Sequence, residues 1–312
     1  MIFKEFEKNP LLAPFKNKFC SKAVYNPAVI KKGKFFYMFF RAESKREGIF
    51  KEEGKKICTG RIMLAISKDG IHFKVKKDPV IWPQKYWEKD GCEDPRVVEI
   101  NGRFWLTYVG LKRGGPSDSV VICLASSKDL FHWEKHGPIL TEERSWHIRE
   151  KSGAILNRKI NGYYIIYFTG EAEAWNPRIG IAYSKDLLHW KEDPKNPILK
   201  PRKGFFDSTG VECGAPPILT EEGILMIYNG WKEDRIYRPG AVLFSKKNPK
   251  KILKRSKKSI IKPIRNWGRK FNQKDHIVAE SLNFHQEKWY LYYGAADRVV
   301  CLATARNLKW DP

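Results

Sequence analysis

Several acidic residues stand beside turn-forming residues, where a carboxylate could do chemistry. Glu212 lies in TGVECGAPP, residues 209–217, whose glycines and prolines build a turn that can approach a ligand closely. Asp94 precedes Pro95 in GCEDPR, and the proline biases Asp94 toward extended backbone at the start of a strand. Asp94, held at the mouth of a strand, is well placed for function, whereas Glu212 could be a catalytic base, the partner of a cation, or a solvated loop charge. The residues alone leave these three interpretations of Glu212 open.

Other charged and polar residues also lie next to apolar strands. They are Asn26, Arg41, Arg61, Glu93, Arg96, Lys151, Glu280 and Asp297. If the strands radiate from one axis, their carboxylates converge with several arginines; the carboxylates are Asp94, Glu212, Glu280 and Asp297. A cluster of buried charges is costly unless its members are paired or used by a ligand. Simple ion pairing therefore remains the alternative for Arg96 and Arg149.

The elements that must hold these residues repeat along the chain. The segment LAISKDGIHFK at residues 64–74 returns at 124–134 and 181–191, with weaker copies at 242–252 and 302–310. Its anchor residues, Ser67, Ser127, Ser184, Ser245 and Ala305, are separated by 60, 57, 61 and 60 positions. A turn and an aromatic strand precede each copy, as in NGRFWLTYVG at residues 101–110.

Five such units, each with room for about four strands, predict an all-β, five-bladed β-propeller. One sheet of this kind cannot bury both of its faces alone, whereas five sheets arranged radially can. We expect residues 1–312 to form this single propeller domain. The Ser and Asp of each copy should make a turn, and the aromatic residue that follows should pack between blades. His72, His132 and His189 are therefore expected to be structural rather than ligands.

The chain is strongly basic, with 59 Lys and Arg against 35 Asp and Glu and a formal net charge of +24. The lysines are spread along the chain, and the only dense cluster is Lys246–Lys258. No recognition motif accompanies this cluster, so a solvated Lys-rich surface is favoured over a nucleic-acid interface.

The six cysteines are scattered without a C-x-x-C pair, which predicts neither a zinc site nor a disulfide framework. Cys123 and Cys301 lie in apolar runs and should be core residues. No apolar signal segment opens the chain and no run of eighteen apolar residues occurs. We therefore expect a cytoplasmic protein without a membrane partner; its oligomeric state is not predicted.

Seven motifs, in order along residues 20–306, resemble glycoside hydrolase family 130, the β-mannoside phosphorylases and β-mannosidases. They include YNPAVI, EDPRV, INGYY, YRPGA and YLYYGAAD. The resemblance implies a five-bladed propeller that acts on small β-mannoside oligosaccharides with inversion and needs no metal or other cofactor. It also implies that Asp94 is the catalytic acid. The expected substrate-binding residues are Asn26, Arg41, Arg61, Glu93, Arg96, Lys151, Asn229 and Asp297.

The chain departs from the phosphorylase pattern where those enzymes hold phosphate. Thr169 and Asn229 stand where phosphorylases typically carry arginine and histidine, whereas Lys151 is retained. Glu280 replaces a cysteine, and Glu212 is a further carboxylate beside the expected phosphate position. A phosphate dianion next to two carboxylates would be repelled by several kcal/mol.

The pattern therefore indicates an inverting hydrolase of short β-mannosides, with β-1,2 linkage the best match. Glu212 or Glu280 would activate water as the base, and the sequence does not rank them. Two alternatives stay open: a phosphorylase whose phosphate site is rebuilt around Arg149 and Lys151, and a propeller that binds glycans without catalysis.

Overall fold

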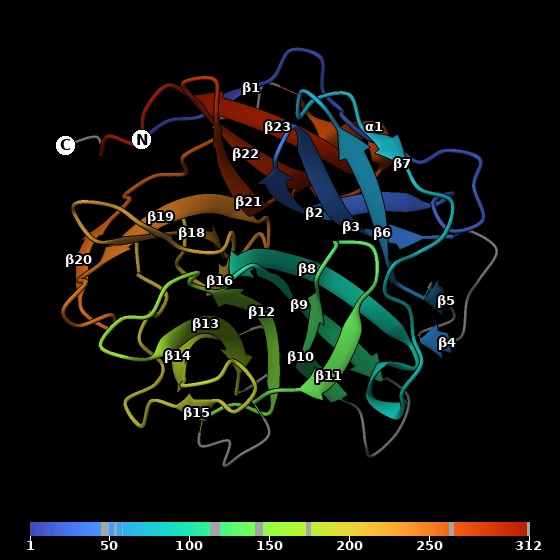
Figure 1. The fold of residues 1–312 in the computed structure, drawn as a ribbon. Coiled ribbons are helices and arrows are strands. Elements are labelled where there is room, and N and C mark those ends of the chain that lie inside the picture. The colour runs from blue at the N-terminus through green and yellow to red at the C-terminus, as the bar shows by residue number, and fades with distance from the viewer. Residues whose placement is uncertain are drawn as a thin grey trace.

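Five separate β-sheets surround a central axis (Figure 1). The computed structural model describes residues 1–44, 50–52, 55–57, 59–112, 119–140, 146–172, 176–261 and 265–310. Every sheet is antiparallel, and in each blade the strand that directly precedes the aromatic strand is the inner one, as expected for a propeller. The predicted five-bladed β-propeller is confirmed.

The blades follow one another along the chain. Blade 1 contains β2 (Ala23–Lys32), β3 (Phe35–Glu43), β6 (Arg61–Ser67) and β7 (Lys74–Val75). Blade 2 contains β8 (Gly91–Ile100), β9 (Arg103–Lys112), β10 (Ser119–Ser127) and β11 (Glu134–Pro138). Blade 3 contains β12 (Arg149–Ile155), β13 (Tyr164–Glu171), β14 (Pro177–Ser184) and β15 (Lys191–Glu192).

Blade 4 contains β16 (Gly210–Cys213), β17 (Ile218–Leu219), β18 (Ile224–Trp231), β19 (Arg238–Phe244) and β20 (Ile252–Arg255). Blade 5 contains β21 (Ile277–His285), β22 (Lys288–Ala295), β23 (Val299–Ala305) and β1 (Lys4–Glu5). A hairpin of β4 (Phe50–Glu52) and β5 (Lys55–Ile57) connects β3 to β6. Two short helices, η1 (Tyr86–Glu88) and α1 (Trp267–Phe271), lie in connections between blades.

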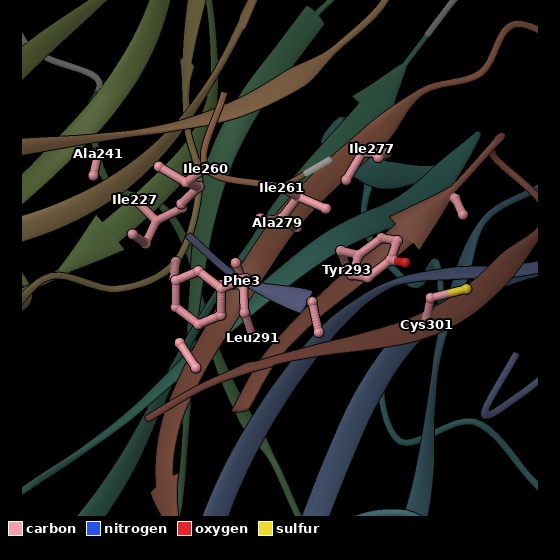
Figure 2. Packing of buried hydrophobic residues seen from close by; sticks show 14 of the residues in the cluster. Phe3, Ile227, Ala241, Ile260, Ile261, Ile277, Ala279, Leu291, Tyr293 and Cys301 are labelled. Carbon is pink, nitrogen blue, oxygen red and sulfur yellow. The ribbon is translucent and has the colours of Figure 1, made fainter. Parts of the chain in front are cut away.

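The N-terminal strand closes the ring. β1 pairs with β23, with Lys4 opposite Thr304, so the outer strand of blade 5 comes from the other end of the chain. Phe3, beside β1, is 1% exposed and belongs to a hydrophobic cluster that includes Ile227 and Leu291 (Figure 2). Burying a phenyl ring contributes roughly 1.5–3 kcal/mol. The two ends of the chain are therefore held together by a strand pair and by packing.

The repeated Ser-Lys-Asp segments form the same turn in three blades. Ser67 Oγ accepts two backbone hydrogen bonds, and Asp69 Oδ1 accepts two more. The Nδ1 of His72 lies 2.7 Å from Asp69 Oδ2, while the ring is largely exposed. The turns that contain His132 and His189 repeat these contacts. All three histidines therefore take part in the turn, which is the structural placement expected for them.

Aromatic residues after these turns pack between neighbouring blades. Trp133 meets Phe39 of blade 1 edge-on, with ring centroids 5.3 Å apart. Phe73 meets Tyr292 of blade 5 in the same way, at 6.2 Å. The repeat therefore supplies both the turn and the contact that fixes one blade against the next.

Cys123 and Cys301 are fully buried in hydrophobic clusters between blades, as predicted. Cys58 lies outside the described residues. Neither of the two buried thiols therefore has a surface position.

The basic cluster Lys246–Lys258 covers the outer edge of blade 4. Within it, Lys250 pairs with Asp193 at 2.7 Å and Lys254 pairs with Glu222 at 2.5 Å. Part of its positive charge is therefore already neutralised by neighbouring carboxylates.

No helix in the described ranges is long and apolar enough to cross a bilayer.

Candidate active site

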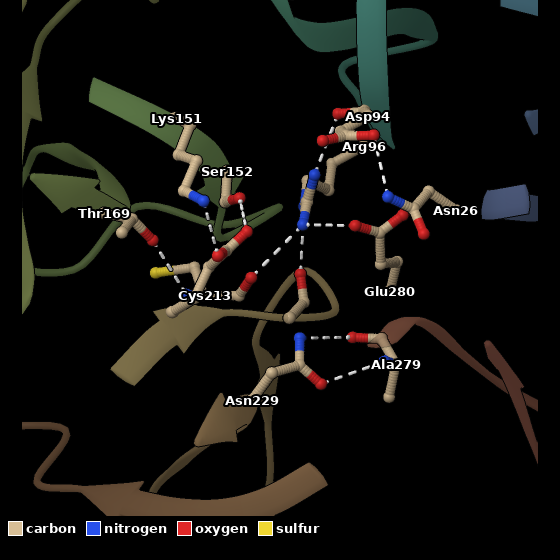
Figure 3. A network of polar contacts seen from close by, with 12 residues as sticks. Asn26, Asp94, Arg96, Lys151, Ser152, Thr169, Cys213, Asn229, Ala279 and Glu280 are labelled. Atoms are coloured by element: carbon tan, nitrogen blue, oxygen red, sulfur yellow. Dashed lines mark hydrogen bonds and ion pairs between the residues drawn. The ribbon is translucent and has the colours of Figure 1, made fainter. Parts of the chain in front are cut away.

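The inner strands of four blades carry a β-bulge near their first residues, and each bulge holds a polar residue. These residues are Asn26 in β2, Asp94 in β8, Ser152 in β12 and Glu280 in β21. A bulge adds one residue to a strand and redirects its side chain. In Figure 3 the polar side chains from the different blades point toward one another. The bulges therefore explain how ordinary inner strands deliver polar groups to one place.

The backbone of Asp94 differs from the expectation. Pro95 predicts extended backbone at Asp94, but its φ is +49°, in the left-handed region. The extra residue in the bulge between Glu93 and Arg96 takes up this conformation. For a residue other than glycine it costs on the order of 1–3 kcal/mol, and such strain clusters at functional sites. Arg96 Nη1 donates a hydrogen bond to the Asp94 carbonyl at 2.8 Å, which helps to hold the bulge.

The Asp94 carboxylate is held on one side only. Asn26 Nδ2 donates to Asp94 Oδ1 at 2.8 Å, and Arg41 Nη1 lies 3.5 Å from the same oxygen. Arg41 Nη2 also pairs with Glu43 and Glu93, at 2.8 and 2.7 Å. The Asp94 side chain is 14% exposed, and no protein hydrogen bond to Oδ2 is recorded among the described residues. This oxygen is available to a ligand.

Glu212 is bound by two neighbours from the inner strand of blade 3. Ser152 Oγ donates to Glu212 Oε1 at 2.6 Å, and Lys151 Nζ lies 2.9 Å from Oε2. Burial alone would lower the pKa of Lys151, but Glu212 beside it raises that pKa well above the ordinary value. Lys151 therefore stays charged, and an ion pair with a cation is part of the environment of Glu212.

Two further residues join this group that sequence reasoning missed. Glu171, at the end of β13, lies 3.9 Å from Lys151 Nζ. Burial raises the pKa of Tyr237, and the charges that act on its hydroxyl are those of Lys151, Glu212, Asp297 and Glu171. The signal for both was present: Glu171 lies two residues after the unusual Thr169, and Tyr237 opens the YRPGA motif.

Arg96 and Glu280 form a buried ion pair. Arg96 Nη2 lies 2.7 Å from Glu280 Oε1, and the two side chains are 1% and 0% exposed. Burial raises the pKa of Glu280, while Arg96 acts in the opposite direction. The remaining recorded hydrogen bonds of Arg96 all go to backbone carbonyls, so its placement does not favour the substrate contact expected from the sequence.

Asn229 also differs from its expected role in substrate binding. Its Oδ1 accepts a hydrogen bond from Ala279 N at 2.9 Å, and its Nδ2 donates to Ala279 O at 3.3 Å. The side chain is fully buried, so its amide joins blade 4 to blade 5. Thr169 Oγ1 makes a similar connection, since it accepts from Cys213 N at 2.9 Å. Both residues at the expected phosphate positions therefore serve as contacts between blades.

Two other predicted residues lie at the same end of the propeller. Asp297 occupies the turn between β22 and β23 with a φ of +48°. The residue is exposed, yet desolvation by the neighbouring protein raises the pKa of its carboxyl. The charges of His276 and Arg41 act in the opposite direction. Arg61, at the start of β6, places its guanidinium 5.1 Å from the ring centre of Phe19.

Comparison with known proteins identifies the family and agrees with the fold. The model of glycoside hydrolase family 130, described as β-1,4-mannooligosaccharide phosphorylase, matches residues 11–309. A 1,2-β-oligomannan phosphorylase of Thermoanaerobacter sp. (strain X514) is 33% identical over 301 residues, with 96% of each chain covered. A β-1,2-mannobiose phosphorylase of the same strain is 33% identical over 311 residues, again with 96% of each chain covered.

Solved structures are also similar to this chain. One has a TM-score of 0.85 and 29% identity, and the match covers 99% of this chain and 96% of the other. It is described as showing that the mannoside phosphorylases of family 130 include glycoside hydrolases that target β-1,2 mannosidic linkages in Candida mannan. A glycosyl hydrolase from Bacteroides ovatus has a TM-score of 0.83 and 28% identity, covering 97% and 92% of the two chains. The chain belongs to glycoside hydrolase family 130.

Proposed function

We propose that this protein is an inverting glycosidase that releases mannose from short β-mannosides, with β-1,2-linked oligosaccharides as the best candidate substrate. The β-1,2-active relatives support the choice of linkage. The choice of water as nucleophile rests on one observation. Glu212 and Glu171 lie 2.9 and 3.9 Å from the Nζ of Lys151, the single lysine retained from the phosphate site.

Asp94 is the general acid in this proposal. Its free Oδ2 can donate a proton to the departing oxygen while Asn26 and Arg41 hold Oδ1. General acid catalysis of this kind contributes about 10²–10⁴-fold to the rate. In inverting glycosidases the base stands on the opposite face of the sugar, with room for one water between.

Glu212 is the proposed base. Its side chain is 5% exposed, and its neighbour Lys151 is 24% exposed, so the pair borders solvent where a water can enter. Ser152 fixes one carboxylate oxygen, and the other faces Lys151. A carboxylate held in this way can take a proton from water as the oxygen attacks the anomeric carbon.

A phosphate dianion would meet a poor environment here. The charge of Lys151 is already balanced by Glu212, and Glu171 adds a second negative charge nearby. Thr169 and Asn229 are engaged between blades and offer no positive charge. Charge-assisted hydrogen bonds, which normally hold phosphate, are therefore scarce, and repulsion costs several kcal/mol at low local dielectric.

Phosphorolysis remains the second candidate, because the curated relatives at 33% identity are phosphorylases and Lys151 is retained. In that case Lys151 would exchange Glu212 for phosphate, with the exposed Arg149 as its partner.

Turnover of β-1,2-mannobiose with and without inorganic phosphate separates the two functions. A hydrolase should give equal rates and free mannose in both mixtures. Strict dependence on phosphate, with mannose 1-phosphate as product, would establish the phosphorylase instead. No turnover of any β-mannoside would point to a propeller that binds glycans without catalysis.

A further inference from the structure

We propose that Glu280 is a positioning residue that acts through Arg96 to hold the strand of the acid Asp94 in place against the strand of the base Glu212. This rests on the proposed function, because the roles of acid and base are taken from there. It departs from the expectation that Glu280 itself activates water.

The Arg96 guanidinium joins three blades. Its Nη1 donates to the carbonyl of Asp94 at 2.8 Å, inside the bulge of blade 2. Its Nε donates to Gly214 O at 3.1 Å and its Nη2 to Cys213 O at 3.2 Å, both directly after the proposed base in blade 4. Nη2 also contacts Glu280 Oε1 in the bulge of blade 5 at 2.7 Å (Figure 3). The backbone beside the acid and the backbone beside the base thus share one side chain.

Arg96 depends on Glu280 for its charge balance. The guanidinium is 1% exposed, and Glu280 is its one ion-pair partner recorded among the described residues. Removing one member of a buried ion pair leaves the other charge uncompensated, which is strongly destabilising. Without the carboxylate we expect Arg96 to shift toward water or toward another carboxylate, and the three carbonyls it holds would lose their common donor.

Glu280 is also badly placed to be the base. Its side chain has no exposure to solvent, whereas a base must reach a water on the face of the sugar opposite the acid. In Figure 3 Glu280 lies with Asn26 and Asp94, across Arg96 from Lys151. The negative charges of Asp94 and Glu212 both raise the pKa of Glu280, and Asp94 contributes more. Glu280 therefore belongs to the acid side of the site.

The acid strand is sensitive to such support. Asp94 has a positive φ, and Arg96 holds the carbonyl of this strained residue. A displacement of about 1 Å between reacting groups can cost about 10²-fold in rate. Glu280 would then affect kcat by fixing the position of Asp94, without contacting the attacking water.

The test compares Glu280→Gln with the matched variant Glu212→Gln. Both substitutions keep shape and remove charge. Azide can replace water: its nitrogen bonds to the anomeric carbon, the glycosidic bond breaks, and the departing oxygen takes the proton of Asp94. We expect Glu280→Gln to lower kcat by roughly 10–10²-fold with little change in KM, to lower Tm, and to gain nothing from azide. Glu212→Gln should regain activity with azide and form α-mannosyl azide.

A double-mutant cycle with Arg96→Lys gives a second readout. If Glu280 acts through Arg96, the double variant should be no slower than Arg96→Lys alone. Azide rescue of Glu280→Gln, full activity of that variant, or losses that multiply in the double variant would overturn the proposal. Should Glu280→Gln fail to fold, Glu280→Asp keeps the charge and withdraws it by one methylene, and a smaller kcat loss without azide rescue is expected. If the wild-type enzyme requires phosphate, the hydrolase proposal fails, while the cycle measured on phosphate-dependent turnover still decides the role of Glu280.

Discussion

Asn26 Nδ2 donates a hydrogen bond to Asp94 Oδ1 at 2.8 Å, and the two residues occupy equivalent bulges of neighbouring blades. Both have left-handed backbone, with φ values of +52° and +49°. The contact therefore joins the strained segments of two inner strands and leaves the second oxygen of Asp94 available for a sugar. The proposed acid catalysis by Asp94 depends on that arrangement.

Replacing Asp94 by asparagine should reduce turnover by about 10²–10⁴-fold, because the amide has no acidic proton to give to the leaving oxygen. The hydrogen bond to Asn26 can persist after an amide flip, so the folded structure should be kept. Steady-state kinetics on β-1,2-mannobiose measure the loss, and thermal unfolding checks the fold. Retention of more than a tenth of the wild-type kcat would remove Asp94 from the role of acid.

Glu212→Gln should lower kcat by a similar factor, about 10²–10⁴, since the amide cannot accept a proton from water. Glu222→Gln serves as the control, because Glu222 lies in a surface turn and pairs with the exposed Lys254 at 2.5 Å. The two variants are compared by kcat at saturating substrate. Equal activity of both would show that Glu212 is not the base.

Glu171→Gln should increase the use of phosphate. The substitution removes one of the two negative charges near Lys151, so a phosphate dianion meets less repulsion. The ratio of mannose 1-phosphate to free mannose, measured at high phosphate concentration, should rise above that of the wild type. An unchanged ratio would mean that Glu171 does not control the choice of nucleophile.

Glu43 should contribute to the stability of the protein in a pH-dependent way. Burial opposes the effect, but Arg41 and Lys22 lower the pKa of Glu43 from 4.5 to about 2. A carboxyl whose pKa is depressed in the folded state stabilises the protein above the unfolded pKa, and this contribution disappears as pH falls toward the folded value. The free energy of unfolding of Glu43→Gln should therefore lie below wild type by roughly 3 kcal/mol at pH 6, with the gap closing between about pH 4.5 and pH 2.

Urea unfolding at a series of pH values measures this gap. The control is Glu99→Gln, since Glu99 forms a partly exposed pair with Lys32 at 2.6 Å and such pairs contribute little. A difference for Glu43→Gln that stays constant from pH 6 to pH 2 would contradict the assignment.

The blade architecture could be predicted because each blade depends on residues that lie close together in the sequence. Each blade contains its own aromatic strand, and three of the five blades contain a Ser-Lys-Asp turn while the other two carry a weaker copy of that segment. The turn around Ser67 uses only residues within a few positions. The number of such units along the chain then gives the number of blades. The expectation that residues 1–312 form a single domain stays a prediction.

The site was predicted less completely, because its geometry depends on contacts between blades. The bulge at Asp94 is a property of the pairing of β8 with β9, and the local effect of Pro95 predicts the wrong backbone there. Arg96 and Asn229 are polar residues near the axis, as are the sugar-binding candidates, and sequence alone cannot tell that their hydrogen bonds go to blades 4 and 5.

Proton NMR of a fresh reaction mixture containing β-1,2-mannobiose and inorganic phosphate distinguishes water attack from phosphorolysis most directly, because it reports the nucleophile and the stereochemistry together. We predict that the first-formed product is free α-mannose and that phosphate does not change the rate of its release. The α-anomer later equilibrates with the β-anomer. Water attack with inversion of a β-linkage leaves an α-hydroxyl. Accumulation of mannose 1-phosphate, or β-mannose as the first product, would contradict it.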